Sequence, residues 1–283
     1  MNILILTSNY PSKESPISGS YVEAQVHLFR EYGHDVDVLI PNFIQLTRRN
    51  PLSFIRVFFK KCIVRPTLHN VVNVEYITFC SRIIHQKIKF EDRDKWKRYD
   101  ILHAHDCLWA GYFASKMKFH EKSKYVITSH RTISLEQNML FAKITFDVLN
   151  NAELIYTVGH LDKSIIKSVL HKKKIITVGN FINEDKFLPC NLFGNKIFEI
   201  TSVTGPSVRK NVPLLLELIS QLKLRNADLK KRFKLNLILA NGYDGISIDD
   251  INNIVLEKCL EDCVEQHISL SQEDMVKVYS RTN

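Results

Sequence analysis

Two neighbouring apolar runs of this sequence each end in a polar cluster that contains histidine. The clusters consist of His103, His105 and Asp106 in the first case and of Ser129, His130 and Arg131 in the second. The carboxyl ends of parallel strands meet at one edge of a sheet, so both clusters are expected to line a single cleft. Imidazole, hydroxyl and guanidinium groups gathered there suit a phosphate or a sugar hydroxyl.

Other chemistry for these histidines is also open. His103 and His105 point to the same side of a strand. One alternative is that they are ordinary packed histidines without a functional role. A zinc site needs a third ligand, and the sequence does not fix the position of His130 relative to His103 and His105 well enough to infer one. No metal is therefore expected. A Ser-His-Asp hydrolase is disfavoured because the sequence contains no Gly-x-Ser-x-Gly motif.

A basic pair, Arg209 and Lys210, is the second candidate for chemistry. The pair stands just before a run with helical spacing, Val212–Leu224. Two cations beside a helix N-terminus are suited to clamp a diphosphate and to stabilise negative charge on a departing nucleoside diphosphate. A solvated basic loop is the alternative interpretation.

The loop after the first apolar run is a third candidate, because Ser18 and Gly19 precede an expected helix there. Ser20 and Glu23 have the spacing of a capping box, and Gly33 is expected to end the helix. Backbone N–H groups at such a helix start bind anions, although a plain tight turn explains one glycine equally well. The sequence has no Gly-x-Gly-x-x-Gly motif, which disfavours a dinucleotide site.

The elements that must position these residues alternate between strand and helix. The expected strands of the first part are Ile3–Thr7, Val36–Ile40, Val71–Ile77, Ile101–His105, Tyr125–Ser129, Leu154–Val158 and Ile175–Val178. This alternation predicts an α/β fold with a doubly wound, Rossmann-like parallel sheet. An Asn- and Gly-rich stretch follows, so we predict a first domain over residues 1–185 and a second over residues 186–283.

The second domain repeats the same alternation. Its expected elements are strands at Ile197–Val203, Leu235–Ala240 and Val264–Leu270, helices at Val212–Leu224 and Asp249–Leu260, and a final helix that opens at Ser271. A complete doubly wound domain of five or six units needs roughly 150 residues. We therefore expect the second domain to be incomplete, either a miniature or a fragment.

The segment 46–65 combines basic and large apolar side chains. Wound as a helix from Pro51, it places Leu52, Ile55, Phe59 and Cys62 near one stripe. Such a helix suits an anionic membrane surface, and a crossover helix with a basic outer side explains the same spacing. The charge agrees with an anionic partner, since residues 1–185 hold 26 basic and 18 acidic residues. No nucleic-acid-binding motif is present.

Composition predicts a cytoplasmic protein. No apolar run reaches the roughly 18 residues of a membrane-spanning helix, and no basic region precedes the short apolar stretch after Met1. The spacing of the six cysteines matches no metal-binding or disulfide pattern, so we expect them to be reduced core thiols.

Taken together, these segments resemble glycosyltransferase family 4, whose members are retaining enzymes of the GT-B fold. The resemblance is carried by SGSYVEAQVHLFREYGHDVDVLIP, YDILHAHDCLWAGYFA, VITSHR, NAELIYTVG, KIITVGNFINEDKF and the RKN loop before VPLLLELISQL. Their order and spacing span nearly the whole chain. A Glu-x7-Glu region of the family lies beyond the final residues QEDMVKVYSRTN.

The resemblance implies a role for several residues. His105 would lie near the reacting sugar, Lys210 would bind the donor diphosphate, and the loop at Ser18 and Gly19 would hold acceptor and donor phosphate. The family's Arg upstream of the lysine is Thr204 or Gly205 here, so Arg209 would take its place.

The implied function is transfer of a hexose, with retention, from a nucleotide sugar such as a UDP- or GDP-hexose to a glycolipid or polysaccharide of the cell surface, as in lipopolysaccharide assembly. The resemblance implies no cofactor beyond this substrate, and a location in the cytoplasm or peripherally on the inner membrane face. The alternatives are a catalytically inactive truncated remnant that acts as a binding domain and, as a third class, a nucleotide-sugar epimerase or an oxidoreductase.

Overall fold

The structure is a computed structural model of the 283-residue chain. It describes residues 1–12, 18–45, 62–64, 71–78, 88–90, 96–107, 109–117, 123–130, 139–182, 184–185, 187–188, 197–225, 232–240 and 245–282. The chain forms two compact units. Met1–Pro11 and Ser18–Ile182 belong to the N-terminal unit, and the C-terminal unit includes Asn183–Asn283.

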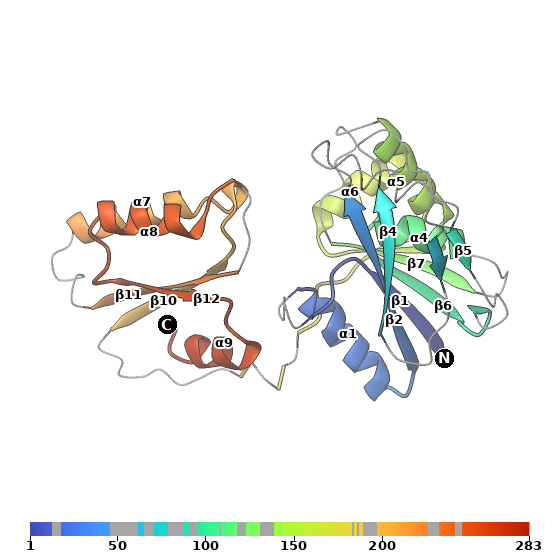
Figure 1. The fold of residues 1–283 in the computed structure, drawn as a ribbon, viewed down its shortest axis with the longest axis horizontal. Helices are drawn as coiled ribbons and strands as arrows, with labels where there is room; N and C mark the ends of the chain where they lie inside the picture. The colour runs from blue at the N-terminus through green and yellow to red at the C-terminus, as the bar shows by residue number, and fades with distance from the viewer. Residues whose placement is uncertain are drawn as a thin grey trace. The chain divides into compact units, whose positions relative to one another are not determined.

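A seven-stranded parallel sheet forms the centre of the N-terminal unit (Figure 1). Its strands are β1 (Asn2–Thr7), β2 (Asp35–Gln45), β4 (Val71–Thr78), β6 (Ile101–His105), β7 (Lys124–Ser129), β8 (Leu154–Thr157) and β9 (Ile175–Thr177). They follow the order β4-β2-β1-β6-β7-β8-β9. The order reverses between β1 and β6, and ligands of such sheets bind beyond the carboxyl ends of the strands at this reversal.

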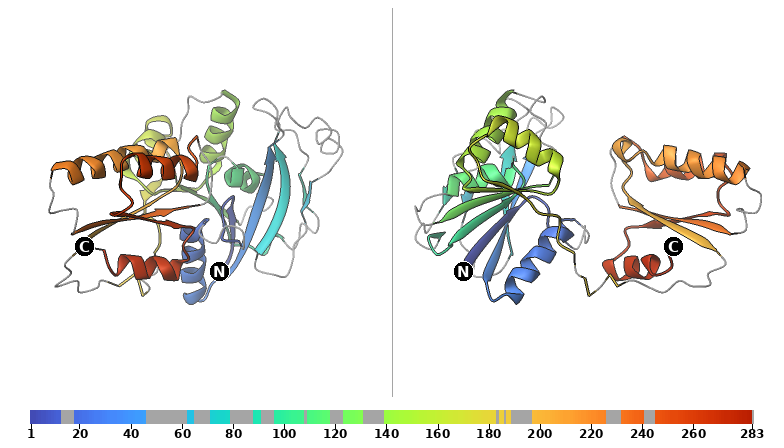
Figure 2. Two further views of the ribbon diagram at one scale, coloured as in Figure 1. Left: turned by 60° about the vertical axis from the view of Figure 1, so that its left-hand side comes forward. Right: turned by 180° about the vertical axis from the view of Figure 1, so that it is seen from behind.

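Helices cover both faces of this sheet (Figure 2). One face carries α4 (Trp109–Met117), α5 (Met139–Asn151) and α6 (His160–Val169), and the other carries α1 (Ser20–Glu31). Successive side chains of a strand point to opposite faces. Leu4 and Leu6 accordingly pack under α4 to α6, whereas Ile3 and Ile5 pack under α1. The predicted doubly wound α/β fold is confirmed.

Helix α1 begins differently from the prediction. Gly19 is its N-cap, with a φ of 68°, and no side chain caps the helix, so the expected capping box of Ser20 and Glu23 is wrong. Ser20 is already the first helical residue, one position too late to cap it. The predicted end is confirmed, because Gly33 has a φ of 77° and its amide donates to the Arg30 carbonyl.

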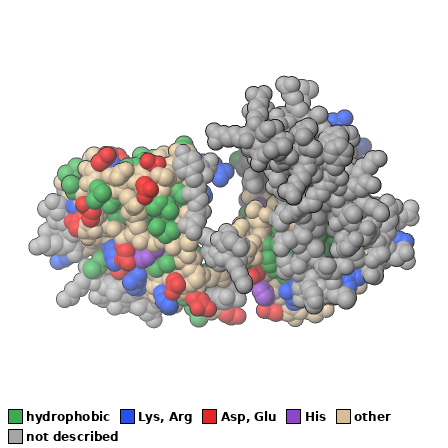
Figure 3. Space-filling view, viewed as in Figure 1, with side chains coloured by type: hydrophobic (Ala, Val, Ile, Leu, Met, Phe, Trp, Pro, Cys, Tyr) green, Lys and Arg blue, Asp and Glu red, His purple; other side chains and the backbone are tan. Residues whose placement is uncertain are grey.

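The C-terminal unit is a smaller layered fold. Its strands β10 (Phe198–Thr204), β11 (Phe233–Leu239) and β12 (Val264–Ile268) form a parallel sheet in that order. Helices α7 (Val212–Arg225) and α8 (Ile248–Glu257) cover one face, and α9 (Gln272–Tyr279) lies on the other (Figures 1 and 2). Ser247 and Ser271 cap α8 and α9. Acidic, basic and hydrophobic side chains are interspersed on the described surface of this unit (Figure 3).

The region between β2 and β6 differs from the sequence expectation. Cys62–Val64 (β3) pairs in parallel with Ile88–Phe90 (β5), so the helical interpretation of segment 46–65 is wrong at Cys62. Apart from β3, this basic segment lies outside the described residues. The cysteine prediction also needs a correction, because Cys259 is exposed, whereas Cys107 and Cys263 are buried.

No helix that the structure describes is both long and apolar enough to cross a bilayer.

Candidate functional site

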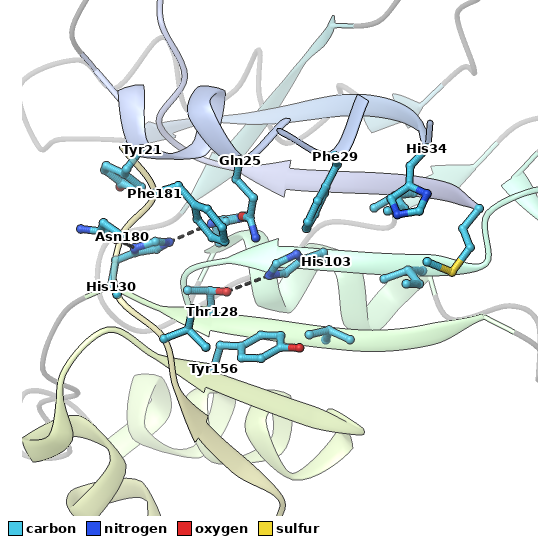
Figure 4. Close-up of a pocket in the computed structure, with 17 residues that line it drawn as sticks. Tyr21, Gln25, Phe29, His34, His103, Thr128, His130, Tyr156, Asn180 and Phe181 are labelled. Atoms are coloured by element: carbon cyan, nitrogen blue, oxygen red, sulfur yellow. Dashed lines mark hydrogen bonds between the residues drawn. The ribbon is translucent and has the colours of Figure 1, made fainter. Parts of the chain in front are cut away.

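A cavity of about 270 Å³ lies between α1 and the sheet face formed by β1, β6, β7 and β8 (Figure 4). Helix α1 contributes Tyr21, Gln25 and Phe29 to its lining. The chain that follows β9 contributes 178–181. The lining is mainly apolar along the strands and becomes polar toward their carboxyl ends.

His103 and His105 reach this cavity because they alternate along β6. Their register places His105 beside Thr7 of β1 and beside Thr128 of β7. The two histidines are only 3% and 4% exposed, and their ring centres lie 4.5 Å apart. Buried polar groups need hydrogen-bond partners. Thr128 supplies one, with its Oγ1 atom 2.7 Å from Nε2 of His103.

His130 joins this group from the end of β7. Its Nε2 atom lies 2.8 Å from Nδ1 of His105, and the two rings stack with their centres 5.1 Å apart. On its other side, Nδ1 of His130 lies 3.1 Å from Oδ1 of Asn180 (Figure 4). The ring of Tyr21 lies 4.4 Å from the His130 ring. The ends of β6 and β7 therefore meet, as their sequence pattern predicts.

The three histidines are neutral near pH 7. Burial lowers the pKa of His103 to about 3 and that of His130 to about 4. Burial also holds the pKa of His105 well below its ordinary value of 6.5, and the neighbouring His103 and His130 lower it further. The group therefore offers hydrogen-bonding nitrogens rather than positive charge.

Asp106 lies next to this group but does not line the cavity. Its Oδ1 atom accepts hydrogen bonds from the amides of Trp109 and Ala110, at 2.7 and 3.2 Å, and so caps α4. Its Oδ2 atom accepts from the Ser8 hydroxyl at 2.8 Å. The φ of Asp106 is 125°, a strained conformation for a residue other than glycine.

The loop residues Ser18 and Gly19 are also absent from the cavity lining. A Cβ atom on Gly19 would lie 2.0 Å from the carbonyl oxygen of Asn9. This close approach of the chain's own backbone, together with the positive φ, explains why a glycine stands there. The explanation needs no ligand.

The C-terminal unit carries the predicted basic pair in a short 3-10 turn, Val208–Lys210, between β10 and α7. Arg209 and Lys210 are both exposed. Asn211 ends the turn with a φ of 49°, and α7 begins directly after it. Among the residues that the structure describes, neither cation forms an ion pair. The predicted position before a helix N-terminus is confirmed.

The remaining predicted site residues contribute less. Ser129 is buried, but its neighbour Thr128 faces the cavity instead, because side chains alternate along β7. Arg131 lies outside the described residues. In the described chain, no three His, Cys, Asp or Glu side chains are arranged to hold a metal ion.

Sequence reasoning missed Asn180 and two aromatic residues of the lining, Tyr21 and Tyr156. Asn180 follows β9 after two intervening residues, His105 is the last residue of β6, and His130 directly follows β7. A polar residue at or just beyond the carboxyl end of an apolar strand is the signal that could have identified Asn180. The Asn- and Gly-rich composition around Asn180 predicts a domain boundary and gives no sign of a place beside the histidines.

The sequence profile of glycosyltransferase family 4 matches residues 18–186. This match includes both histidine clusters and Asn180. No curated protein matches the sequence.

Several solved structures share the fold. The N-terminal domain of trehalose-6-phosphate phosphatase from Candida albicans aligns with a TM-score of 0.63 and 11% identity, over 97% of this chain and 74% of that one. HepE from Anabaena, in complex with UDP and glucose, aligns at 0.58 and 12%, over 100% and 72%. A glycosyltransferase from Rickettsia africae aligns at 0.55 and 15%, over 100% and 71%. At such identities the likeness shows the fold alone.

Proposed function

Since the chain belongs to glycosyltransferase family 4, we propose that it transfers a hexose from a nucleotide sugar to a hydroxyl group of a glycan or lipid-linked acceptor, with retention of configuration. The bond between the anomeric carbon and the diphosphate breaks, and a nucleoside diphosphate leaves. A bond from the anomeric carbon to the acceptor oxygen forms, and the proton of the acceptor hydroxyl passes to the leaving diphosphate.

The observation that carries this proposal is the neutral histidine group at the carboxyl ends of β6 and β7. His103, His105 and His130 are held at the edge where a doubly wound sheet binds ligands, and they carry no positive charge near pH 7. Uncharged imidazoles suit the hydroxyl groups of a sugar. In this proposal His105 contacts the transferred hexose.

Arg209 and Lys210 take the second role, which is to bind the donor diphosphate. Both side chains are exposed cations next to the N-terminus of α7, where backbone amides also favour an anion. Catalysis would then come from positioning donor and acceptor and from stabilising the charge of the leaving diphosphate. No metal or other cofactor takes part in this scheme.

The experiment that tests the proposal measures release of nucleoside diphosphate by the purified chain with a panel of UDP- and GDP-hexoses. We expect one donor to support release that persists in the presence of a chelator and is lost in His105→Ala. The matched control is His171→Ala, which removes an exposed histidine. Donor binding without turnover would instead identify a binding domain, and the absence of both would overturn the proposal.

We further propose that the acceptor belongs to cell-surface polysaccharide or glycolipid assembly and that the protein binds the inner membrane surface peripherally. The basic residues of segment 46–65 motivate the membrane proposal. Co-sedimentation with anionic vesicles tests it. Binding that disappears with neutral vesicles is expected, and equal binding to both would contradict it.

A further inference from the structure

Asn180, His130 and His105 form a chain of hydrogen bonds that ends at a nitrogen with no hydrogen-bond partner in the described part of the protein. The first contact joins Oδ1 of Asn180 to Nδ1 of His130 at 3.1 Å, and the second joins Nε2 of His130 to Nδ1 of His105 at 2.8 Å. The remaining ring nitrogen, Nε2 of His105, is buried and has no hydrogen-bond partner among the described residues. His105 itself lines the cavity.

The direction of these hydrogen bonds follows from Asn180. An amide oxygen can only accept, so Nδ1 of His130 must carry a hydrogen. Burial lowers the pKa of His130 to about 4, which leaves its ring neutral near pH 7 with one hydrogen, and its Nε2 atom is therefore an acceptor. Nδ1 of His105 must then donate to it. Because the His105 ring is neutral as well, its Nε2 atom has no hydrogen and presents a lone pair.

We propose that Asn180 and His130 are positioning residues that fix His105 as the Nδ1–H tautomer, so that Nε2 of His105 accepts a hydrogen bond from a hydroxyl group of a ligand bound in the cavity. The ligand class rests on the proposed function, since the hydroxyls of a hexose are such donors. The tautomer itself is independent of that function.

This arrangement distinguishes ligands by hydrogen-bond direction rather than by charge. A hydroxyl group can donate to the lone pair of Nε2. A carbonyl or phosphate oxygen would bring a second lone pair to the same point and would leave two buried acceptors unpaired. The chain of hydrogen bonds from Asn180 through His130 to His105, here called the relay, therefore favours a sugar hydroxyl over a phosphate group at this position.

Asn180 is a good position for a test because its side chain is exposed, and substitutions of exposed residues seldom unfold a protein. Asn180→Ala removes the acceptor that orients His130. Asn180→Asp keeps an oxygen at the same position and serves as the conservative rescue. The control is Asn211→Asp, at an exposed turn of the C-terminal unit. Asn236→Asp is unsuitable because Asn236 is fully buried.

The first measurement is the protonation pattern of the histidine rings, from long-range ¹H–¹⁵N correlation spectra of the ¹⁵N-histidine-labelled chain at pH 7. We expect hydrogen on Nδ1 and none on Nε2 for His105, in the original protein, in Asn180→Asp and in Asn211→Asp. Asn180→Ala should give a mixture of both tautomers. Hydrogen on Nε2 of His105 in the original protein, or an unchanged pattern in Asn180→Ala, would overturn the proposal.

The second measurement is kinetic and uses the donor identified by the diphosphate-release assay. Asn180→Ala should lower kcat/KM about tenfold, which corresponds to the loss of one well-oriented hydrogen bond, and Asn180→Asp should recover most of it. Equal activity of the original protein, Asn180→Ala and Asn180→Asp would contradict the proposed contact between His105 and the ligand. If no donor supports turnover, the proposed function fails. The tautomer pattern still tests whether Asn180 and His130 fix the tautomer of His105.

Discussion

His103 and His105 are 3% and 4% exposed at the end of β6, whereas Arg209 and Lys210 lie exposed in the turn between β10 and α7. A buried polar group without a partner destabilises a fold by about 1 to 3 kcal/mol, and His103 and His105 each have a partner within the protein on one ring nitrogen. The cations remain in water and acquire theirs only from a ligand. The N-terminal unit thus orients its polar groups before binding, and the C-terminal unit leaves them adaptable.

The largest expected effect comes from the backbone that supports the N-terminal site. Gly19→Ala should lower the free energy of unfolding by about 3 kcal/mol or more. The left-handed conformation alone costs roughly 1 to 2 kcal/mol, and the new Cβ atom would lie 2.0 Å from the Asn9 carbonyl oxygen. Denaturant titration measures the loss.

Two glycines provide the matched controls for this substitution. Gly33 has a φ of 77°, and no atom of the described residues lies within 4 Å of an added Cβ, so Gly33→Ala isolates the conformational cost of about 1 kcal/mol. Among the described residues, the Cβ atom of Gly245→Ala in the C-terminal unit would meet the exposed side chain of Val208, whose Cγ2 atom is nearest and can move. If all three variants lost the same stability, the N-terminal backbone would not be the more tightly fitted one.

The next effect concerns the exposed cations. Lys210→Ala should weaken binding of the nucleoside diphosphate about 30-fold, because one charge-assisted hydrogen bond to phosphate contributes about 2 kcal/mol. Isothermal titration calorimetry measures the change. Arg225→Ala, at the exposed far end of α7, is the control and should bind normally. The comparison would be reversed if His105→Ala weakened diphosphate binding more than Lys210→Ala does.

Lowering the pH should affect the buried histidines. The pKa of His103 is about 3 in the folded protein, below its ordinary value of 6.5. The unfolded chain therefore takes up a proton below about pH 6.5 when the folded protein does not, and stability is lost as the pH falls toward 3. Between pH 7 and pH 5 this amounts to about 2 kcal/mol for His103.

Unfolding titrations at both pH values measure this loss. His103→Asn should reduce the difference between pH 7 and pH 5 by about 2 kcal/mol, and His171→Gln, which alters an exposed histidine, should not change it. A pH dependence that His103→Asn leaves unaltered would show that His103 is not held neutral.

The smallest effect compares two helix starts. Ser247 caps α8, and its hydroxyl accepts from the Asp250 amide at 3.0 Å, so Ser247→Ala should cost about 1 kcal/mol. Ser20 makes no cap for α1, and Ser20→Ala should stay within about 0.5 kcal/mol. Thermal unfolding measures both, and equal losses would contradict this distinction.

Much of the fold was predictable from the sequence because buried parallel strands appear as short apolar runs. All seven strands predicted for the first part are present, with ends shifted by a few residues. The failures occurred where a tertiary contact decides the structure. Ser20 and Glu23 have the spacing of a capping box, yet the approach of Asn9 to Gly19 makes the glycine the cap.

The candidate site was predictable only in part. Strand alternation correctly brought His103 and His105 to one side, and parallel pairing brought His130 beside them. The helix-capping role of Asp106 and the contact between Asn180 and His130 were not foreseen. The contact between Asn180 and His130 depends on segments that lie far apart in the sequence, and the role of Asp106 depends on a single strained backbone angle. Neither feature leaves a periodic signal in the sequence.

Asp106 joins the end of β1, through Ser8, to the start of α4, and does so from a backbone angle that favours glycine. Glycine would relieve the strain there but would sever both attachments, and most other side chains would keep the strain and lose the attachments. During divergence this position is therefore expected to admit few substitutions, chiefly asparagine, which retains one acceptor and tolerates unusual backbone angles.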